Sequence, residues 1–187
     1  MKRFELVCAV GATLLLLGSA PSVLAASSKP AAAAAAKPTT TTAPTSIGTF
    51  KSWTAWTGQD ANGLICYVSA EPTSSKPDGL NRDPVHFLVV HRKGLGTKNE
   101  VQTLIGYPLK KDSKPIATVD KKTYPMLADG NGAWLASTAD EAGFVAAMKS
   151  GTTLTIKGTS QRGTETTDTY TLSGATAAMQ AIDKACS

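Results

Sequence analysis

The sequence predicts a mainly β protein, an antiparallel sandwich with two short helices, and three observations lead to that class. Short runs of alternating apolar and polar residues recur along the chain, as where Leu154 and Ile156 alternate with threonines. Glycine-bearing turns such as Arg162-Gly163 separate the runs. Helical spacing occurs only in two short stretches, which end near Lys149 and Cys186. Many short strands with two helices are typical of a sandwich.

The C-terminal third gives the clearest local pattern. Residues 152–159 and 164–172 form a predicted hairpin, and Ser173 stands where the N-cap of a helix belongs. The helix that follows has one apolar stripe, formed by Ala175, Ala178, Met179, Ile182 and Cys186. We therefore expect Cys186 to face the body of the domain.

The remaining elements follow from the same periodicities. The predicted strands are residues 50–56, 64–70, 85–91, 100–107, 115–119, 124–127 and 133–135. Residues 85–91 are apolar on both faces, which predicts a central strand. Residues 71–83 read as a long polar loop. Thr138 with Glu141 forms a predicted capping box for a helix that runs through Lys149 and ends at Gly151.

The N-terminal segment predicts export. Residues 1–25 combine a basic start, an apolar run and a small-residue cleavage site, which is typical of a signal peptide. The apolar run is shorter than the roughly 20 residues of a membrane span, so we expect no transmembrane segment in the mature chain. Residues 26–45 are rich in alanine, proline and threonine and predict a disordered tether. The folded domain is then residues 46–187, located in the periplasm, on the outer envelope or outside the cell.

Two cysteines remain after the predicted signal peptide, with its Cys8, is removed. An exported chain with two cysteines indicates a disulfide, here between Cys66 and Cys186. On the chain-entropy model this bridge restricts the unfolded state by about 4–5 kcal/mol. Neither a C-x-x-C motif nor a ligand spacing of the histidines is present, so we expect no metal and no cofactor.

The charge of the domain is no strong argument for nucleic acid as a partner, and the predicted export argues against one. From residue 46 onward the chain has 15 basic and 13 acidic residues, a net charge of +2. One basic segment still stands out, residues 109–123, with Lys110, Lys111, Lys114, Lys121 and Lys122. These lysines are candidate contacts to an anionic lipid or polysaccharide, and a solvated rim is the alternative interpretation.

The chain resembles the invasion-associated locus B proteins of alphaproteobacteria. The resemblance rests on the export signal, the opening between Trp53 and Cys66, the lysine-rich hairpin, and two C-terminal runs. These runs are Lys-Ser-Gly-Thr-Thr-Leu-Thr-Ile-Lys-Gly-Thr-Ser-x-Arg-Gly-Thr from Lys149 and Asp-Thr-Tyr-Thr-Leu-Ser-Gly from Asp168. The resemblance implies an immunoglobulin-like sandwich in the envelope, a link to host-cell invasion, and no enzymatic activity. The chain lacks the second cysteine pair of many members and has Ala175 where their motif has phenylalanine.

Two functional hypotheses follow. The first is a non-catalytic binding or adaptor module whose partner is an envelope or host component, contacted through the lysines or through Trp53 and Trp56, of which one must face the core. The second is an envelope hydrolase or lyase. His86 and His91 lie on opposite faces of one predicted strand, and neither a Gly-x-Ser-x-Gly nor a phosphate-loop motif is present, so the sequence favours the first.

Overall fold

The computed structural model describes residues 43–187, so the predicted signal peptide and most of the predicted tether lie outside the described residues. The strands are β1 (Thr45–Phe50), β2 (Trp53–Asp60), β3 (Gly63–Ala70), β4 (Ser74–Lys76), β5 (His86–Arg92), β6 (Thr97–Leu104), β7 (Ile116–Val119), β8 (Lys122–Asp129), β9 (Gly132–Leu135), β10 (Thr153–Thr159) and β11 (Glu165–Thr171). The helices are α1 (Glu141–Ser150) and α2 (Ala175–Ala185), with short 3-10 turns at Lys93–Leu95 and Thr138–Asp140. Neither α1 nor α2 is long and apolar enough to cross a membrane.

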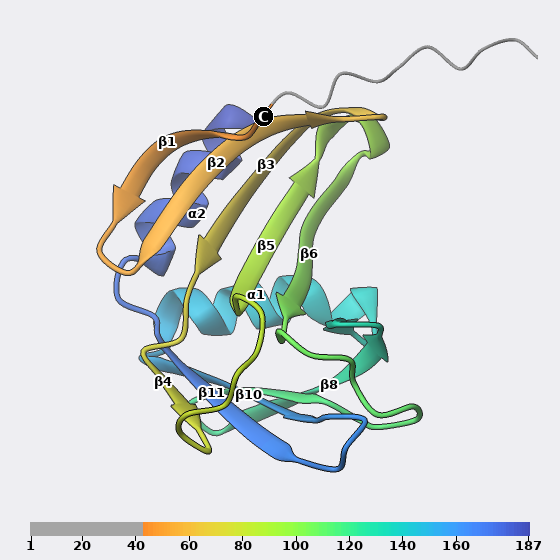
Figure 1. Ribbon diagram of the computed structural model, residues 1–187. Coiled ribbons are helices and arrows are strands. Elements are labelled where there is room, and N and C mark those ends of the chain that lie inside the picture. Colours follow the sequence, from red (N-terminus) through yellow and green to blue (C-terminus); the bar gives the residue numbers. More distant parts are fainter. Residues whose placement is uncertain (1–42) are drawn as a thin grey trace, which may run out of the picture. The chain divides into compact units, whose positions relative to one another are not determined.

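All strands described belong to one hydrogen-bonded sheet with the order β1-β2-β3-β5-β6-β9-β8-β7-β10-β11-β4, in which every pairing is antiparallel. The strand β8 turns the corner, because its first four residues pair with β7 and its last four with β9. We call β1-β2-β3-β5-β6-β9 with the last four residues of β8 the first half-sheet, and β7-β10-β11-β4 with the first four residues of β8 the second (Figure 1). The sheet is not closed, since β1 and β4 remain as edges. The structure thus confirms the mainly β antiparallel class with two helices.

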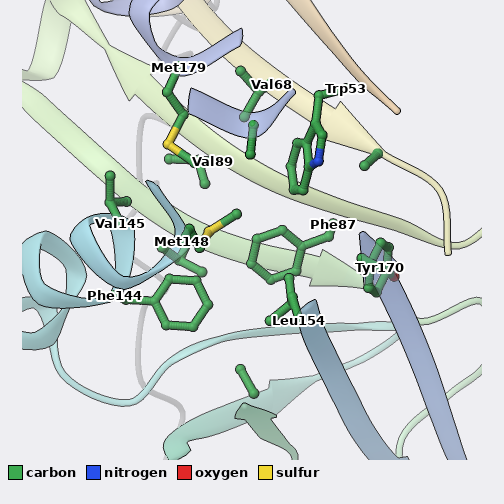
Figure 2. Close-up of a cluster of buried hydrophobic side chains, with 14 of the residues drawn as sticks. Trp53, Val68, Phe87, Val89, Phe144, Val145, Met148, Leu154, Tyr170 and Met179 are labelled. Atoms are coloured by element: carbon green, nitrogen blue, oxygen red, sulfur yellow. The ribbon is translucent and has the colours of Figure 1, made fainter. Parts of the chain in front are cut away.

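The two half-sheets pack against each other through one core. The indole Nε1 of Trp53 on β2 donates a hydrogen bond to the carbonyl oxygen of Thr171 on β11, at 2.9 Å. The rings of Phe87 and Tyr170 meet with their centroids 5.9 Å apart. Phe144 of α1 stacks on the other side of Phe87, at 5.8 Å (Figure 2). The sandwich interior is therefore filled by large aromatic side chains from both halves and from α1.

Helix α2 covers the inner face of the first half-sheet, where Met179 points toward Val68 and Val89 (Figure 2). Its apolar stripe is buried as predicted, and Cys186 forms the predicted disulfide with Cys66, with the two Cα atoms 6.0 Å apart. The last helix is thus covalently attached to a central part of the sheet.

Several predicted boundaries are wrong for local reasons. The predicted strand 50–56 is interrupted by a turn at Lys51, whose φ of 55° lies in the left-handed region, so the chain forms β1 and β2 instead. The predicted loop 71–83 contains the edge strand β4. Both caps are wrong too. The N-cap of α1 is Asp140 and that of α2 is Gly174, and neither helix has a side-chain cap hydrogen bond.

Candidate functional site

A cleft of about 410 Å³ opens where three loops converge. One wall comes from the β4–β5 loop, one from the chain after β6, and one from the β10–β11 turn. Its lining residues are Leu80, Asn81, Arg82, Asp83, Gly106, Tyr107, Pro108, Ser160, Gln161, Arg162, Thr164 and Thr166. The cleft therefore combines an aromatic ring and apolar side chains with amides, hydroxyls and arginines, a mixture that suits a small polar ligand.

A buried ion pair holds the first wall in place. Asp168 on β11 has a side chain that is 0% exposed, and Arg82 of the β4–β5 loop is 9% exposed. Both terminal nitrogens of Arg82 donate to the Asp168 carboxylate, and Ser75 Oγ donates a third hydrogen bond at 2.7 Å. The hydrogen bonds to Asp168 raise the pKa of Arg82 above its usual value. A charged group this deeply buried needs such a partner. Separation of the β4–β5 loop from β11 would therefore cost free energy, because it would leave a buried charge unpaired.

Gly106 joins the first wall to the second. The backbone N–H of Asp83 donates to the Gly106 carbonyl oxygen at 2.9 Å. A Cβ atom at position 106 would lie only 2.3 Å from the Asp83 carbonyl oxygen, and φ of Gly106 is +77°. Only glycine fits this contact without a shift of the backbone.

Tyr107 forms one side of the cleft and packs against two residues of the β10–β11 hairpin, Gly158 and Thr166. Its hydroxyl lies 2.6 Å from Thr166 Oγ1, and a Cβ atom at Gly158 would lie 3.0 Å from the same hydroxyl. Gly158 and Thr166 are directly paired across the hairpin. Burial raises the pKa of Tyr107, against the opposite effect of its hydrogen bond with Thr166. The phenol is thus a neutral, oriented hydrogen-bonding group.

The predicted lysine segment begins directly after the second wall of the cleft. Lys110 lies beside the hairpin turn, since its backbone N–H donates to the Thr159 carbonyl oxygen at 2.9 Å, and Gln161 N–H donates to Pro108 at 3.0 Å. Arg162 and Lys111 are exposed, and neither forms a salt bridge with any described residue.

The structure divides the five candidate lysines into two groups, all exposed. Lys110, Lys111 and Lys114 precede β7, whereas Lys121 and Lys122 follow it at the far end of the strand. The Lys122 ammonium lies 5.0 Å from the Tyr124 ring centroid. The basic segment is therefore not one hairpin surface, and only its first part adjoins the cleft.

The two candidate tryptophans have different environments. Trp53 is 0% exposed, so the expectation that one of them faces the core is confirmed, and Trp53 cannot contact a partner. Trp56 lies on the opposite face of β2, stacked near Tyr67, and its Nε1 donates to Ser69 Oγ at 3.0 Å.

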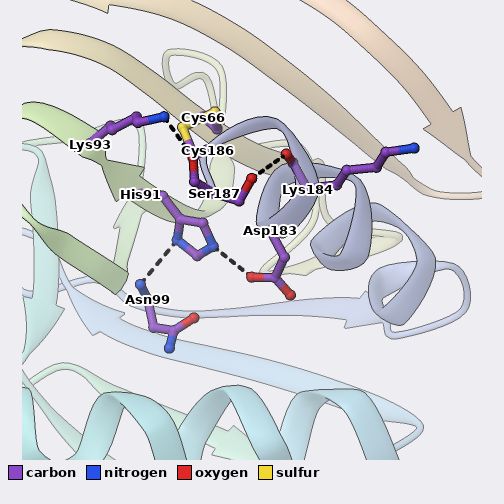
Figure 3. The surroundings of a disulfide bond; sticks show 8 residues. All are labelled: Cys66, His91, Lys93, Asn99, Asp183, Lys184, Cys186 and Ser187. Atoms are coloured by element: carbon purple, nitrogen blue, oxygen red, sulfur yellow. Dashed lines mark hydrogen bonds and ion pairs between the residues drawn. A yellow bond between two sulfur atoms is a disulfide. The ribbon is translucent and has the colours of Figure 1, made fainter.

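The histidines also separate as expected. His86 is half-buried, while His91 is buried between β6 and α2, next to the disulfide (Figure 3). The backbone N–H of Asn99 donates to His91 Nδ1 at 3.1 Å, so Nε2 carries the proton and donates to Asp183 at 2.9 Å. Both ring nitrogens of His91 are thereby occupied in holding α2 on the sheet. Among the described residues, no group of three or more histidine, cysteine or acidic side chains is placed to hold a metal ion.

Together these features define a disulfide-closed antiparallel β protein with a polar cleft at the end of its open sheet. The family model for the invasion associated locus B (IalB) protein matches residues 53–183, and the chain belongs to this family. The crystal structure of invasion associated protein B from Bartonella henselae has a similar fold, with a TM-score of 0.50 and 13% identity over 74% of this chain and 96% of that one. None of the curated proteins matches the chain.

Arg82 and Tyr107 were not among the residues that sequence reasoning singled out. Arg162 and Asp168 stand in the two C-terminal runs that carry the family resemblance, but their pattern alone assigns no role. One local signal was available: a glycine inside a strand, such as Gly158, marks a close approach of another group.

Proposed function

We propose that the protein is an exported, non-catalytic binding module of the bacterial envelope, and that its cleft binds an acidic oligosaccharide. The observation that carries this proposal is the composition of the cleft. Asn81, Gln161 and Arg162 can form paired hydrogen bonds with sugar hydroxyls and carboxylates, and the Tyr107 ring offers an apolar surface for a sugar ring. The membership in the IalB family links the protein to host-cell invasion.

Binding is favoured over hydrolysis by the acidic residues of the cleft. Asp83 is the single carboxylate among the lining residues, and none of them is histidine or cysteine. Most glycoside hydrolases use two carboxyl groups, one on each side of the bond. An oligosaccharide bound here would meet hydrogen-bonding groups but not that pair.

The basic residues in and beside the cleft select for an anionic ligand. Arg162 lines the cleft, and Lys110 and Lys111 follow the lining residue Pro108 in sequence, whereas Asp83 is the one carboxylate of the lining. Exposed cations of this kind attract an anion over about 8 Å at physiological ionic strength. We therefore expect affinity to fall as salt is added.

The test uses oligogalacturonate as the acidic probe and a malto-oligosaccharide as the neutral one, with binding measured by calorimetry. K110E/K111E is expected to abolish oligogalacturonate binding. K121E/K122E makes the same change of charge at the other end of β7 and is expected to leave binding unchanged. R162Q tests the cleft itself and should weaken binding about tenfold, in line with a lost charge-assisted hydrogen bond.

Two results would contradict the proposal. If K110E/K111E and K121E/K122E lose the same affinity for oligogalacturonate, the effect depends on the net charge of the protein and not on the position of the lysines. If oligogalacturonate and the malto-oligosaccharide bind with the same affinity, the basic residues do not select an anionic ligand.

A further inference from the structure

The outer face of the first half-sheet, the face turned away from α2 and the core, carries several large aromatic and apolar side chains, with Ser69, His86 and Gln102 among them. Residues directly paired in an antiparallel sheet share a face. Trp56 pairs with Tyr67 on the next strand, and further along the sheet Trp134 pairs with Leu127. Six large residues of this outer face are Trp56, Tyr67, Leu88, Leu104, Leu127 and Trp134.

These side chains are accessible. Leu104 is 41% exposed and Leu127 is 61% exposed. The second half-sheet shows what a solvated outer face looks like in the same molecule, since Thr123, Thr118 and Thr155 form one cross-strand row there. The aromatic character is thus a property of one face and not of the whole surface.

The size of this face fits a transient contact. Six strands and about 20 Å of strand length give a face of roughly 500 Å², of which the apolar side chains cover only a part. A stable interface usually takes about 800 Å² from each partner, so this face alone is small for a constitutive dimer.

Acidic residues outnumber basic ones around this face. The strand register places Asp60, Arg92, Glu100 and Asp129 on this face, three acidic residues and one basic residue with a net charge of −2. Arg92 is already engaged, with distances of 2.9 Å to Asp60 and 3.0 Å to Glu100. Asp129 and Glu141 form no salt bridge with any described residue. The domain as a whole is basic, so the face has the opposite sign to its surroundings.

Glu141 shows that negative charge is in excess at one end of this face. It is the first residue of α1 and lies close enough to Glu100 to be affected by that charge. Burial and the nearby charge of Glu100 raise the pKa of Glu141. An incoming cation would relieve this repulsion, whereas a second copy of the same face would add to it.

We propose that the outer face of the first half-sheet docks a basic amphipathic segment of another protein, with its apolar side on the aromatic centre and its cations on the acidic rim. The site is separate from the cleft and does not depend on the function proposed for it. The protein would then have two binding surfaces of opposite charge.

The test measures binding of a labelled amphipathic helix of leucine and lysine, with a leucine and glutamate helix as the matched probe. Fluorescence anisotropy gives the affinity, and tryptophan emission reports the site, because Trp56 and Trp134 lie on the face while Trp53 is buried. L104S/L127S removes exposed apolar contacts and is expected to weaken binding by about tenfold or more. D129N/E141Q is expected to weaken it about three- to tenfold at low salt. D112N/E165Q makes the same change of net charge elsewhere and should have no effect.

The proposal is supported if the lysine helix binds, the glutamate helix does not, and both face variants weaken binding. It is overturned if the two helices bind equally, if D112N/E165Q weakens binding as much as D129N/E141Q, or if no binding occurs up to about 1 mM. Analytical sedimentation of the protein alone tests whether a second copy of the protein occupies this face. Self-association that L104S/L127S abolishes would show that a second copy covers this face, and would overturn the proposal.

Discussion

Replacement of Arg82 by methionine tests the account of the buried ion pair. The change leaves the Asp168 carboxylate, which is 0% exposed, without its cation. Removal of one partner of a buried pair costs roughly 3–5 kcal/mol of unfolding free energy. Ser75 still donates to the carboxylate at 2.7 Å, so we expect the lower part of that range, about 3 kcal/mol.

Urea unfolding followed by tryptophan fluorescence measures this loss, since Trp53 is in the core beside β11. The corresponding drop in melting temperature is about 6–12 °C for a domain of this size. The exposed pair of Lys76 and Asp78, whose side chains are 66% and 77% exposed, is the control. Lys76→Met should cost less than about 1 kcal/mol.

The double variant Arg82→Met/Asp168→Leu decides the mechanism. If the cost of Arg82→Met arises from an uncompensated buried charge, the double variant should be more stable than Arg82→Met alone, because a well-packed apolar pair replaces a buried ion pair at little cost. A double variant less stable than Arg82→Met, or a loss below about 1 kcal/mol in Arg82→Met, would refute the reasoning.

Three further predictions concern other parts of the fold. Cys66→Ser/Cys186→Ser should lower the unfolding free energy by up to about 4–5 kcal/mol, measured by urea unfolding, because the bridge spans 120 residues. Burial raises the pKa of Asp183, but the hydrogen bond from His91 and the charge of a nearby lysine outweigh it and lower the pKa overall. The resulting stabilisation is present above the unfolded pKa of about 3.9 and is lost as pH falls through the lower folded pKa, so acid titration of Asp183→Asn should show a smaller loss of stability. Gly106→Ala should destabilise the domain, seen as a lower melting temperature, because its Cβ would lie 2.3 Å from a carbonyl oxygen.

Much of the fold could be predicted because each signal was local. The apolar alternation of Leu154 and Ile156 gave the C-terminal hairpin, and the helical stripe gave the buried face of α2. The pairing of Cys66 with Cys186 could be predicted because the predicted signal peptide contains Cys8, the third cysteine of the chain. These features depend on residues close in sequence or on a choice among very few partners.

The cleft could not be predicted in the same way because its residues come from three distant loops. Arg82 lies in a polar loop. Its ion-pair partner, Asp168, is 86 residues further along the chain, and no local sequence pattern indicates this pairing. The edge strand β4 was missed for the same reason, since three polar residues have no periodicity of their own. Their pairing with β11 is decided by tertiary structure.

The open sheet explains why the cleft lies where it does. Among the connections that cross between the half-sheets at this end, those from β4 to β5 and from β6 to β7 contribute walls of the cleft. Each crossing segment is attached at its base, the first through Arg82 and Asp168, the second through Tyr107 and Thr166. The exposed residues of these loops do not pack in the core. Their sequence can therefore change without loss of the core. A fixed base with exposed tips would suit the binding role that we propose for the cleft, in which Arg162 is one of the lining residues.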